Sequence, residues 1–118
     1  MNSPLTEQQM MTIIRNGLKK SHNPKHIIII GAGMAGLVSA SLLKESGHKV
    51  TILEANDRVG GRVYTIRTPF SENLYFNAGP MRIPEKHQLT FEYIKKFKLP
   101  TNLFINSTPN DILYANGI

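Results

Sequence analysis

The sequence contains no cysteine. This absence excludes disulfides, thiolate nucleophiles, cysteine-based metal sites and any cysteinyl link to a cofactor within the chain. The histidines do not replace these ligands, because they are scattered without the paired spacing of a metal centre. They are His22, His26, His48 and His87. We therefore predict no metal site.

A secretory signal is also missing from the opening residues, which have neither a charged start nor an apolar run. We accordingly expect a cytoplasmic location. One apolar stretch, from Ile27 to Leu43, raises the question of a membrane span. It is shorter than the ~20 residues that a spanning helix needs, and it contains isoleucines followed by closely spaced glycines. We predict that the protein does not bind a membrane.

The chain has few acidic residues, and its formal net charge is +6. The lysines and arginines nevertheless form no dense basic block and do not alternate with aromatic residues. This scatter favours solvated helix faces over a nucleic-acid interface. The excess positive charge supplies at most a background attraction for an anionic cofactor or substrate. A length of 118 residues allows one compact core.

Apolar spacing predicts an amphipathic helix over roughly residues 6–20. Thr6 and Gln9 have the spacing of a reciprocal N-terminal cap. The run from Ser21 to Pro24 ends the helix, because proline lacks an amide hydrogen and disfavours helical geometry in its predecessor. The apolar face consists of Met10, Ile13, Ile14 and Leu18.

A strand, a glycine turn, a helix and a second strand follow one another over the next thirty residues. The unalternating run at 25–30 is typical of a strand buried on both faces of a parallel sheet. Apolar residues then recur at helical spacing from Met34 to the Ser46–Gly47 pair. Residues 49–53 predict a second strand, which ends at Glu54. This order predicts a βαβ unit with a right-handed crossover.

The glycine turn between strand and helix carries the GxGxxG spacing at Gly31, Gly33 and Gly36. Such glycines make a tight turn, let a pyrophosphate approach the backbone and let helix and strand pack closely. Glu54 lies about 20 residues downstream, where a carboxylate accepts hydrogen bonds from ribose hydroxyls and repels a 2′-phosphate. These residues predict a dinucleotide other than NADP and leave NAD and FAD open.

A glycine doublet at 60–61 follows shortly after Glu54 and is succeeded by Arg62. A doublet permits another close backbone approach, and arginine offers several donors to a phosphate or a polar flavin edge. A simple turn with exposed arginines is the alternative. Taken with the preceding turn, the doublet points to a longer ligand than NAD.

Residues 27–62 resemble the opening of the flavin amine oxidase superfamily, which carries a GxGxxG turn, an acid-ended second strand and a GGR element in this order. The resemblance implies FAD as the cofactor. It places Gly31, Gly33, Gly36 and Gly61 in the cofactor site. The other implied contacts are Met34 and Ala35 at the pyrophosphate turn, Glu54 and Ala55 at the adenosine, and Arg62 beside the cofactor.

Residues 77–87 are similar to the GPMR segment of L-amino-acid oxidases, and residues 14–19 and 23–26 resemble the lead-in of that family. The resemblance implies that Gly79, Pro80, Met81 and Arg82 line the flavin. It further implies that Arg82 binds the substrate carboxylate, which a guanidinium can hold through two parallel hydrogen bonds. Without the family match, an arginine in this position would be interpreted as a surface residue.

Beyond the doublet, the pattern predicts a strand at 62–66, a loop at 69–77 and an amphipathic helix at 85–97. We predict no regular element after Pro100. The inner face of the helix is expected to carry Leu89, Tyr93, Ile94 and Phe97.

The predicted fold class is α/β, with a helical arm at residues 1–24 and a partial, Rossmann-like FAD-binding domain at 25–118. The resemblance implies the N-terminal part of a larger two-domain flavoenzyme. That enzyme would use oxygen to convert L-amino acids to 2-oxo acids, ammonia and hydrogen peroxide. We expect the present chain to be a fragment that binds FAD poorly and is inactive alone.

Several alternatives stay open at this point. They are a monoamine or polyamine oxidase, an amino-acid monooxygenase, and a non-catalytic nucleotide-binding module. The catalytic base, the side-chain preference and the oligomeric state, including a homo-oligomer of the full-length enzyme, are not determined by these residues.

Overall fold

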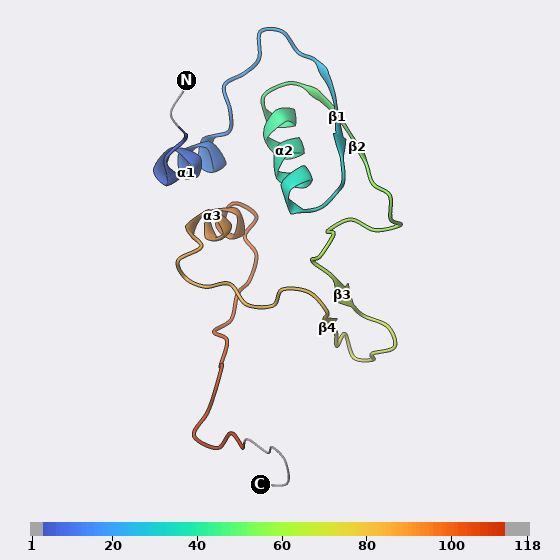
Figure 1. Cartoon of the computed structure of the whole chain (residues 1–118), viewed down its shortest axis with the longest axis vertical. Helices are drawn as coiled ribbons and strands as arrows, with labels where there is room; N and C mark the ends of the chain where they lie inside the picture. The colour runs from blue at the N-terminus through green and yellow to red at the C-terminus, as the bar shows by residue number, and fades with distance from the viewer. Residues whose placement is uncertain (1–3, 113–118) are drawn as a thin grey trace.

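The computed structural model describes residues 4–112. Figure 1 shows a helix and two paired strands at the centre, with a pair of helices on one side and a short hairpin on the other. The elements in chain order are α1 (Glu7–Asn16), β1 (His26–Ile30), α2 (Met34–Glu45), β2 (Lys49–Leu53), β3 (Thr65–Ile66), β4 (Phe76–Asn77) and α3 (Gln88–Lys96). This mixture of helices and strands is an α/β arrangement.

Helix α1 begins with the predicted reciprocal cap. The Gln9 amide donates to Thr6 Oγ1, and the Thr6 amide donates to Gln9 Oε1 at 2.9 Å. The helix is shorter than predicted, because Gly17 adopts a φ of 77° and ends it after Asn16. Leu18, predicted on the apolar face, therefore lies beyond the helix and is exposed.

Strands β1 and β2 are parallel, and α2 connects them. Ile27 pairs with Val50, and Ile29 pairs with Ile52. Helix α2 packs on both strands and covers one face of this pair. Side chains alternate between the two faces of β1, and every second one, including Ile28 and Ile30, points away from α2. Ile30 is accordingly 88% exposed.

The prediction that the first strand is buried on both faces is therefore wrong for the described chain. A continuous isoleucine run indicates a strand with two apolar faces, but burial of the second face requires another layer. Within residues 4–112, only β2 and α2 make extensive contacts with β1. The apolar face of Ile28 and Ile30 is thus available to solvent.

Strands β3 and β4 form a short antiparallel pair, in which Thr65 lies opposite Asn77. The strand predicted at 62–66 is reduced to its last two residues, and the loop predicted at 69–77 ends in β4. The reason lies in the preceding turn. Gly60 and Gly61 have positive φ angles of 105° and 59°, which hold the backbone away from strand geometry.

Helix α3 packs against α1, although the two helices are separated by most of the chain. Arg15 Nε donates to Glu92 Oε2 at 2.6 Å, and Glu92 is only 6% exposed. The hydrogen bond from Arg15 lowers the pKa of Glu92 to about 2. Phe97, predicted on the inner face, follows the end of α3 and is 56% exposed.

Residues 101–112 contain no helix or strand, as predicted. Among the described residues, no helix combines the length and the apolar character that crossing a bilayer requires. The stretch from Ile27 to Leu43 instead supplies β1, the glycine turn and most of α2. The boundary at residue 24 stays a prediction.

Candidate functional site

The three glycines of the first turn differ in what the fold requires of them. Gly31 adopts a φ of 96°, which favours glycine, and its amide donates to Leu53 O at 2.7 Å. A Cβ at Gly36 would lie 2.0 Å from Gly31 O, so close packing of helix and turn excludes a side chain there. Gly33 has an ordinary φ of −75°, and a Cβ on it would meet no atom within 4 Å. A side chain at Gly33 would therefore enter open space rather than protein.

Helix α2 begins at this open side. Its N-cap, Gly33, has no side chain that could accept from the first amides, and its first turn contains no acidic residue. Leu37 is the first residue of the helix whose amide donates to a carbonyl of this turn, Gly33 O, at 2.9 Å. The preceding N–H groups and the positive end of the helix dipole are thus directed outward.

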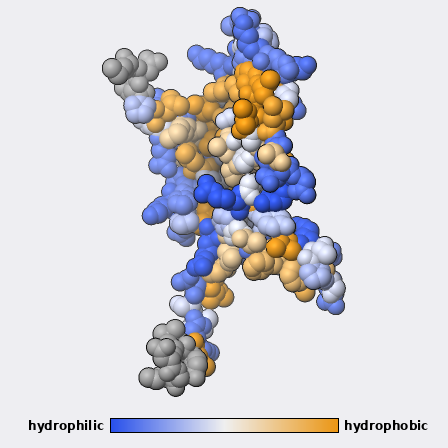
Figure 2. All heavy atoms as spheres, turned by 45° about the vertical axis from the view of Figure 1, so that its right-hand side comes forward, coloured by the Kyte–Doolittle hydropathy of each residue, from blue (hydrophilic) through white to orange (hydrophobic). Residues whose placement is uncertain are grey.

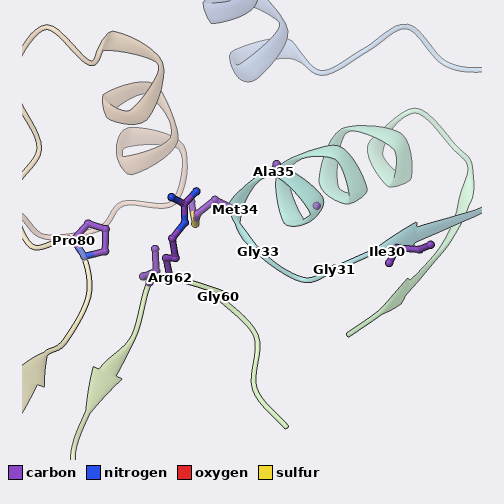
Figure 3. A pocket seen from close by; sticks show the side chains of 10 residues that line it. Ile30, Gly31, Gly33, Met34, Ala35, Gly60, Arg62 and Pro80 are labelled. Carbon is purple, nitrogen blue, oxygen red and sulfur yellow. The ribbon is translucent and has the colours of Figure 1, made fainter. Parts of the chain in front are cut away.

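A pocket of about 680 Å³ lies at the start of α2 (Figure 3). It brings together several predicted cofactor residues, namely Gly31, Gly33, Met34, Ala35, Gly36, Arg62 and Pro80. In Figure 3 the Arg62 side chain points toward Met34, while Pro80 lies on the opposite side of the opening. The pocket therefore joins the first glycine turn, the second glycine turn and the residues after β4.

The pocket also contains Ile30, Gly60 and Val63, which the sequence analysis did not select. Ile30 precedes Gly31 and Val63 follows Arg62 in the sequence. Adjacency to predicted cofactor residues could therefore have identified both. Gly60 is the first member of the doublet, whose second member, Gly61, was predicted instead. Gly61 does not line the pocket.

The second glycine turn docks on the first. The Gly60 amide donates to Ala32 O at 2.8 Å, and Gly60 forms an isolated parallel bridge with Gly33. A Cβ on Gly61 would lie 3.4 Å from the Gly33 Cα. In the structure, the doublet is a place where one backbone turn approaches another. That it also lets a ligand approach the backbone stays a prediction.

Glu54 links the first glycine turn to the residues that follow β2. Its Oε2 accepts from the Ala32 amide at 2.6 Å, and its Oε1 accepts from the Asn56 amide at 2.9 Å. The hydrogen bond from the Asn56 backbone, followed by that from Ala32, lowers the pKa of Glu54 to about 2. The side chain therefore stays a carboxylate even in moderately acidic solution. Glu54 and Ala55 do not line the pocket.

The Gly79–Arg82 segment is divided between two cavities. A Cβ on Gly79 would lie 2.2 Å from Arg62 O, so this glycine packs against the second turn. Pro80 lines the pocket at α2, whereas Met81 and Arg82 line a second cavity of about 600 Å³. The structure therefore does not bring Arg82 into the pocket that contains Gly33.

Arg82 lies instead against the segment that follows α3. Its Nη1 donates to Asn106 Oδ1 at 2.9 Å, and its guanidinium lies 4.9 Å from the centre of the Phe104 ring. Sequence reasoning identified neither partner, because the sequence around residues 104–106 has no regular pattern. The second cavity has aromatic walls formed by Tyr75, Phe91 and Phe104.

No group of three or more histidine, aspartate or glutamate side chains in the described part of the chain could hold a metal ion. The space-filling view in Figure 2 shows hydrophobic side chains gathered on the surface in several places. Exposed hydrophobic residues include Ile28, Ile30 and Leu53 of the paired strands.

The sequence profile described as "Flavin containing amine oxidoreductase" matches residues 34–118. The chain belongs to this family. Within it, the similarity is to L-amino-acid oxidases. The protein named "Putative L-amino-acid oxidase YobN" of Bacillus subtilis is 71% identical over 118 residues, which are all of this chain and 24% of that relative.

Snake proteins named L-amino-acid oxidase are similar over nearly the same range. The protein of Daboia russelii is 51% identical over 111 residues, which are 94% of this chain and 22% of the relative. The protein of Vipera ammodytes ammodytes is 53% identical over 111 residues, again 94% of this chain and 23% of the relative. The chain thus spans less than a quarter of the length of these relatives.

Proposed function

We propose that this chain is the FAD-binding segment of an oxidoreductase that acts on L-amino acids. The observation that carries the proposal is the open side of Gly33. The backbone conformation of Gly33 does not require glycine, and a Cβ on Gly33 would contact no described atom. The missing side chain leaves room in the pocket, as expected where a pyrophosphate approaches the backbone. In this interpretation β1, α2 and β2 form a Rossmann-like dinucleotide-binding unit.

The pocket residues have the chemistry that a dinucleotide needs. The amides of Met34 and Ala35 lie at the uncapped end of α2 and would donate to the pyrophosphate. Arg62 supplies a guanidinium on the facing turn, where it would neutralise a phosphate or donate to a polar flavin edge. Gly36 and Gly31 keep the turn close to the helix.

Glu54 and Ala55 would bind the adenosine. Glu54 Oε2 accepts one hydrogen bond among those described, and a carboxylate oxygen has capacity for two. A ribose hydroxyl could therefore donate to it without displacing Ala32. This acceptor is ionised at neutral pH, and its lowered pKa keeps it ionised in moderately acidic solution as well.

The names of the relatives favour an amino acid over a simple amine as the substrate of the complete enzyme. FAD, when bound, supplies the acceptor for the two electrons and the hydrogen removed at the substrate α-carbon. Arg82 would bind the substrate carboxylate: Asn106 occupies one of its donors, so other donors are available for a paired interaction. Met81, Gly79 and Pro80 would line the flavin.

Titration of the purified chain with FAD tests the proposal. We expect weak, saturable quenching of flavin fluorescence that ADP reverses, because the adenosine and pyrophosphate make most of the contacts. FMN, which lacks the adenosine, is the matched control and should bind far less. A folded chain that binds neither FAD nor ADP would contradict the proposal. The separate arm at residues 1–24 and the cytoplasmic location stay predictions, testable by limited proteolysis and by cell fractionation.

A further inference from the structure

Arg58 donates hydrogen bonds to several carbonyls along the second glycine turn. It does not line the pocket itself. Its Nη2 donates to Gly61 O at 2.9 Å. Its Nη1 makes longer contacts with Val63 O at 3.4 Å and Val59 O at 3.5 Å. A single guanidinium thus contacts carbonyls before, within and after the glycine doublet.

The guanidinium is held in place by an aromatic ring. It lies 4.1 Å from the centre of the Tyr64 ring, a separation at which a cation is attracted to an aromatic face. Tyr64 O also accepts from the Ala78 amide at 2.9 Å, which joins the turn to the segment after β4. Arg58 is therefore fixed from two sides, by carbonyls along its edge and by Tyr64 on its face.

The turn needs such support, because few other interactions determine its shape. Gly60 and Gly61 both have positive φ angles, and glycine itself restricts the backbone very little. The described backbone hydrogen bonds of the doublet are those from Gly60 to Ala32 O and from Val63 to Gly60 O. The planar fork of arginine can satisfy several carbonyls at once, which a lysine ammonium cannot do with the same geometry.

We propose that Arg58 is a positioning residue, which fixes the shape of the second glycine turn. A fixed turn keeps Gly60 docked on Ala32 and keeps Arg62 and Gly60 in the pocket. The part of this inference that concerns the cofactor rests on the proposed FAD site. The part that concerns the turn does not, because it follows from contacts within the protein. The two parts can be measured separately.

Hydrogen exchange of single amides, followed by NMR on the 15N-labelled chain, measures the turn. In Arg58→Gln we expect the Gly60 amide to exchange about tenfold faster, since a charge-assisted hydrogen bond and the contact with Tyr64 are lost. Arg58→Lys should restore only part of the protection. The Ile29 amide in β1 is the internal reference and should keep its rate, which separates local opening from general destabilisation.

Arg67→Gln is the matched control. Arg67 also lies over a tyrosine ring, 5.3 Å from the centre of Tyr75, and its loss changes the net charge by the same amount. We expect no change at the Gly60 amide in this variant. An unchanged Gly60 rate in Arg58→Gln, or an equal increase in Arg67→Gln, would overturn the role of Arg58 in the turn.

Titration with FAD measures the consequence for the pocket. We expect Arg58→Gln to weaken FAD binding about tenfold and Arg67→Gln to leave it unchanged. If Arg58→Gln loosened Gly60 but bound FAD like the parent chain, the positioning of the pocket by Arg58 would be wrong. If the parent chain bound no FAD, the proposed function would fail, while the exchange rates would still decide the role of Arg58.

Discussion

The two cavities of this protein are built in different ways. The pocket at α2 is formed mainly by backbone: turns containing Gly31, Gly33 and Gly60 approach one another and leave a space at the start of a helix. The second cavity depends on side chains, because Arg82 reaches an asparagine and a phenylalanine that come from the segment after α3. A backbone site is encoded by a short motif, whereas a side-chain site depends on how distant segments meet.

Gly36→Ala is the substitution that most severely tests the backbone site. The new Cβ would lie 2.0 Å from Gly31 O, which is a backbone atom and cannot move independently of the turn. We expect a loss of about 3 kcal/mol in the free energy of unfolding, because helix and turn must separate. Urea unfolding followed by far-UV circular dichroism measures this loss. A variant as stable as the parent chain would mean that α2 and the turn are not packed as described.

Gly33→Ala separates folding from binding at a position only three residues away. Its Cβ would meet no described atom, so we expect the free energy of unfolding to change by no more than about 0.5 kcal/mol. The methyl group would occupy the pocket, and we expect at least about tenfold weaker FAD binding, the change that ~1.4 kcal/mol produces. Fluorescence titration checks this. Unchanged FAD affinity would remove Gly33 from the cofactor site.

Arg82→Ala tests the side-chain cavity in a full-length enzyme that contains this segment. Loss of a charge-assisted pair corresponds to ~1.5–3 kcal/mol, so we expect the KM for L-amino acids to rise about tenfold to hundredfold. The KM for the corresponding amines, which lack the carboxylate, should change little. Steady-state kinetics with both substrate types provide the comparison. Equal increases for both would exclude a specific carboxylate contact.

The dependence of stability on acidic pH compares two carboxylates. Glu54 lies beside the glycine turns, and Glu92 lies between α1 and α3. The folded-state pKa values of Glu54 and Glu92 are lowered to about 2, below their ordinary value of 4.5. Their contribution to stability is therefore fully present above about pH 4.5 and is lost as the pH falls toward 2. Glu54→Gln and Glu92→Gln should each make stability less dependent on pH in this window, as thermal unfolding at several pH values would show.

The same titration distinguishes the two residues. Glu54→Gln should also weaken FAD binding, because the adenosine acceptor is lost. Glu92→Gln should only loosen the α1–α3 contact, since Glu92 accepts from Arg15 and Lys95 far from the glycine turns. If Glu92→Gln changed FAD affinity as much as Glu54→Gln, the helix pair would be coupled to the pocket.

Local signals in the sequence predicted the elements that depend on neighbours in the chain. The reciprocal cap of Thr6 and Gln9, the end of β1 at Gly31 and the start of α2 at Met34 all agree with the structure. Errors occurred where a distant segment decides the outcome. The strand predicted at 62–66 is shortened by the turn at Gly60 and Gly61, which docks on Ala32 of the first turn. Ile30 is exposed because no described element packs on its face of the strand pair.

The sequence by itself determined the βαβ order, the three glycines and the acid at the end of β2, because turn geometry and residue spacing act over a few positions. Only the tertiary structure decided that the glycine doublet docks on the first turn, that Glu54 accepts from Ala32 of that turn, and that Arg58 contacts carbonyls along the second turn. It also decided that Arg82 lies in a separate cavity. These contacts join residues through hydrogen bonds whose partners have no fixed spacing in the chain, so a linear pattern cannot specify them.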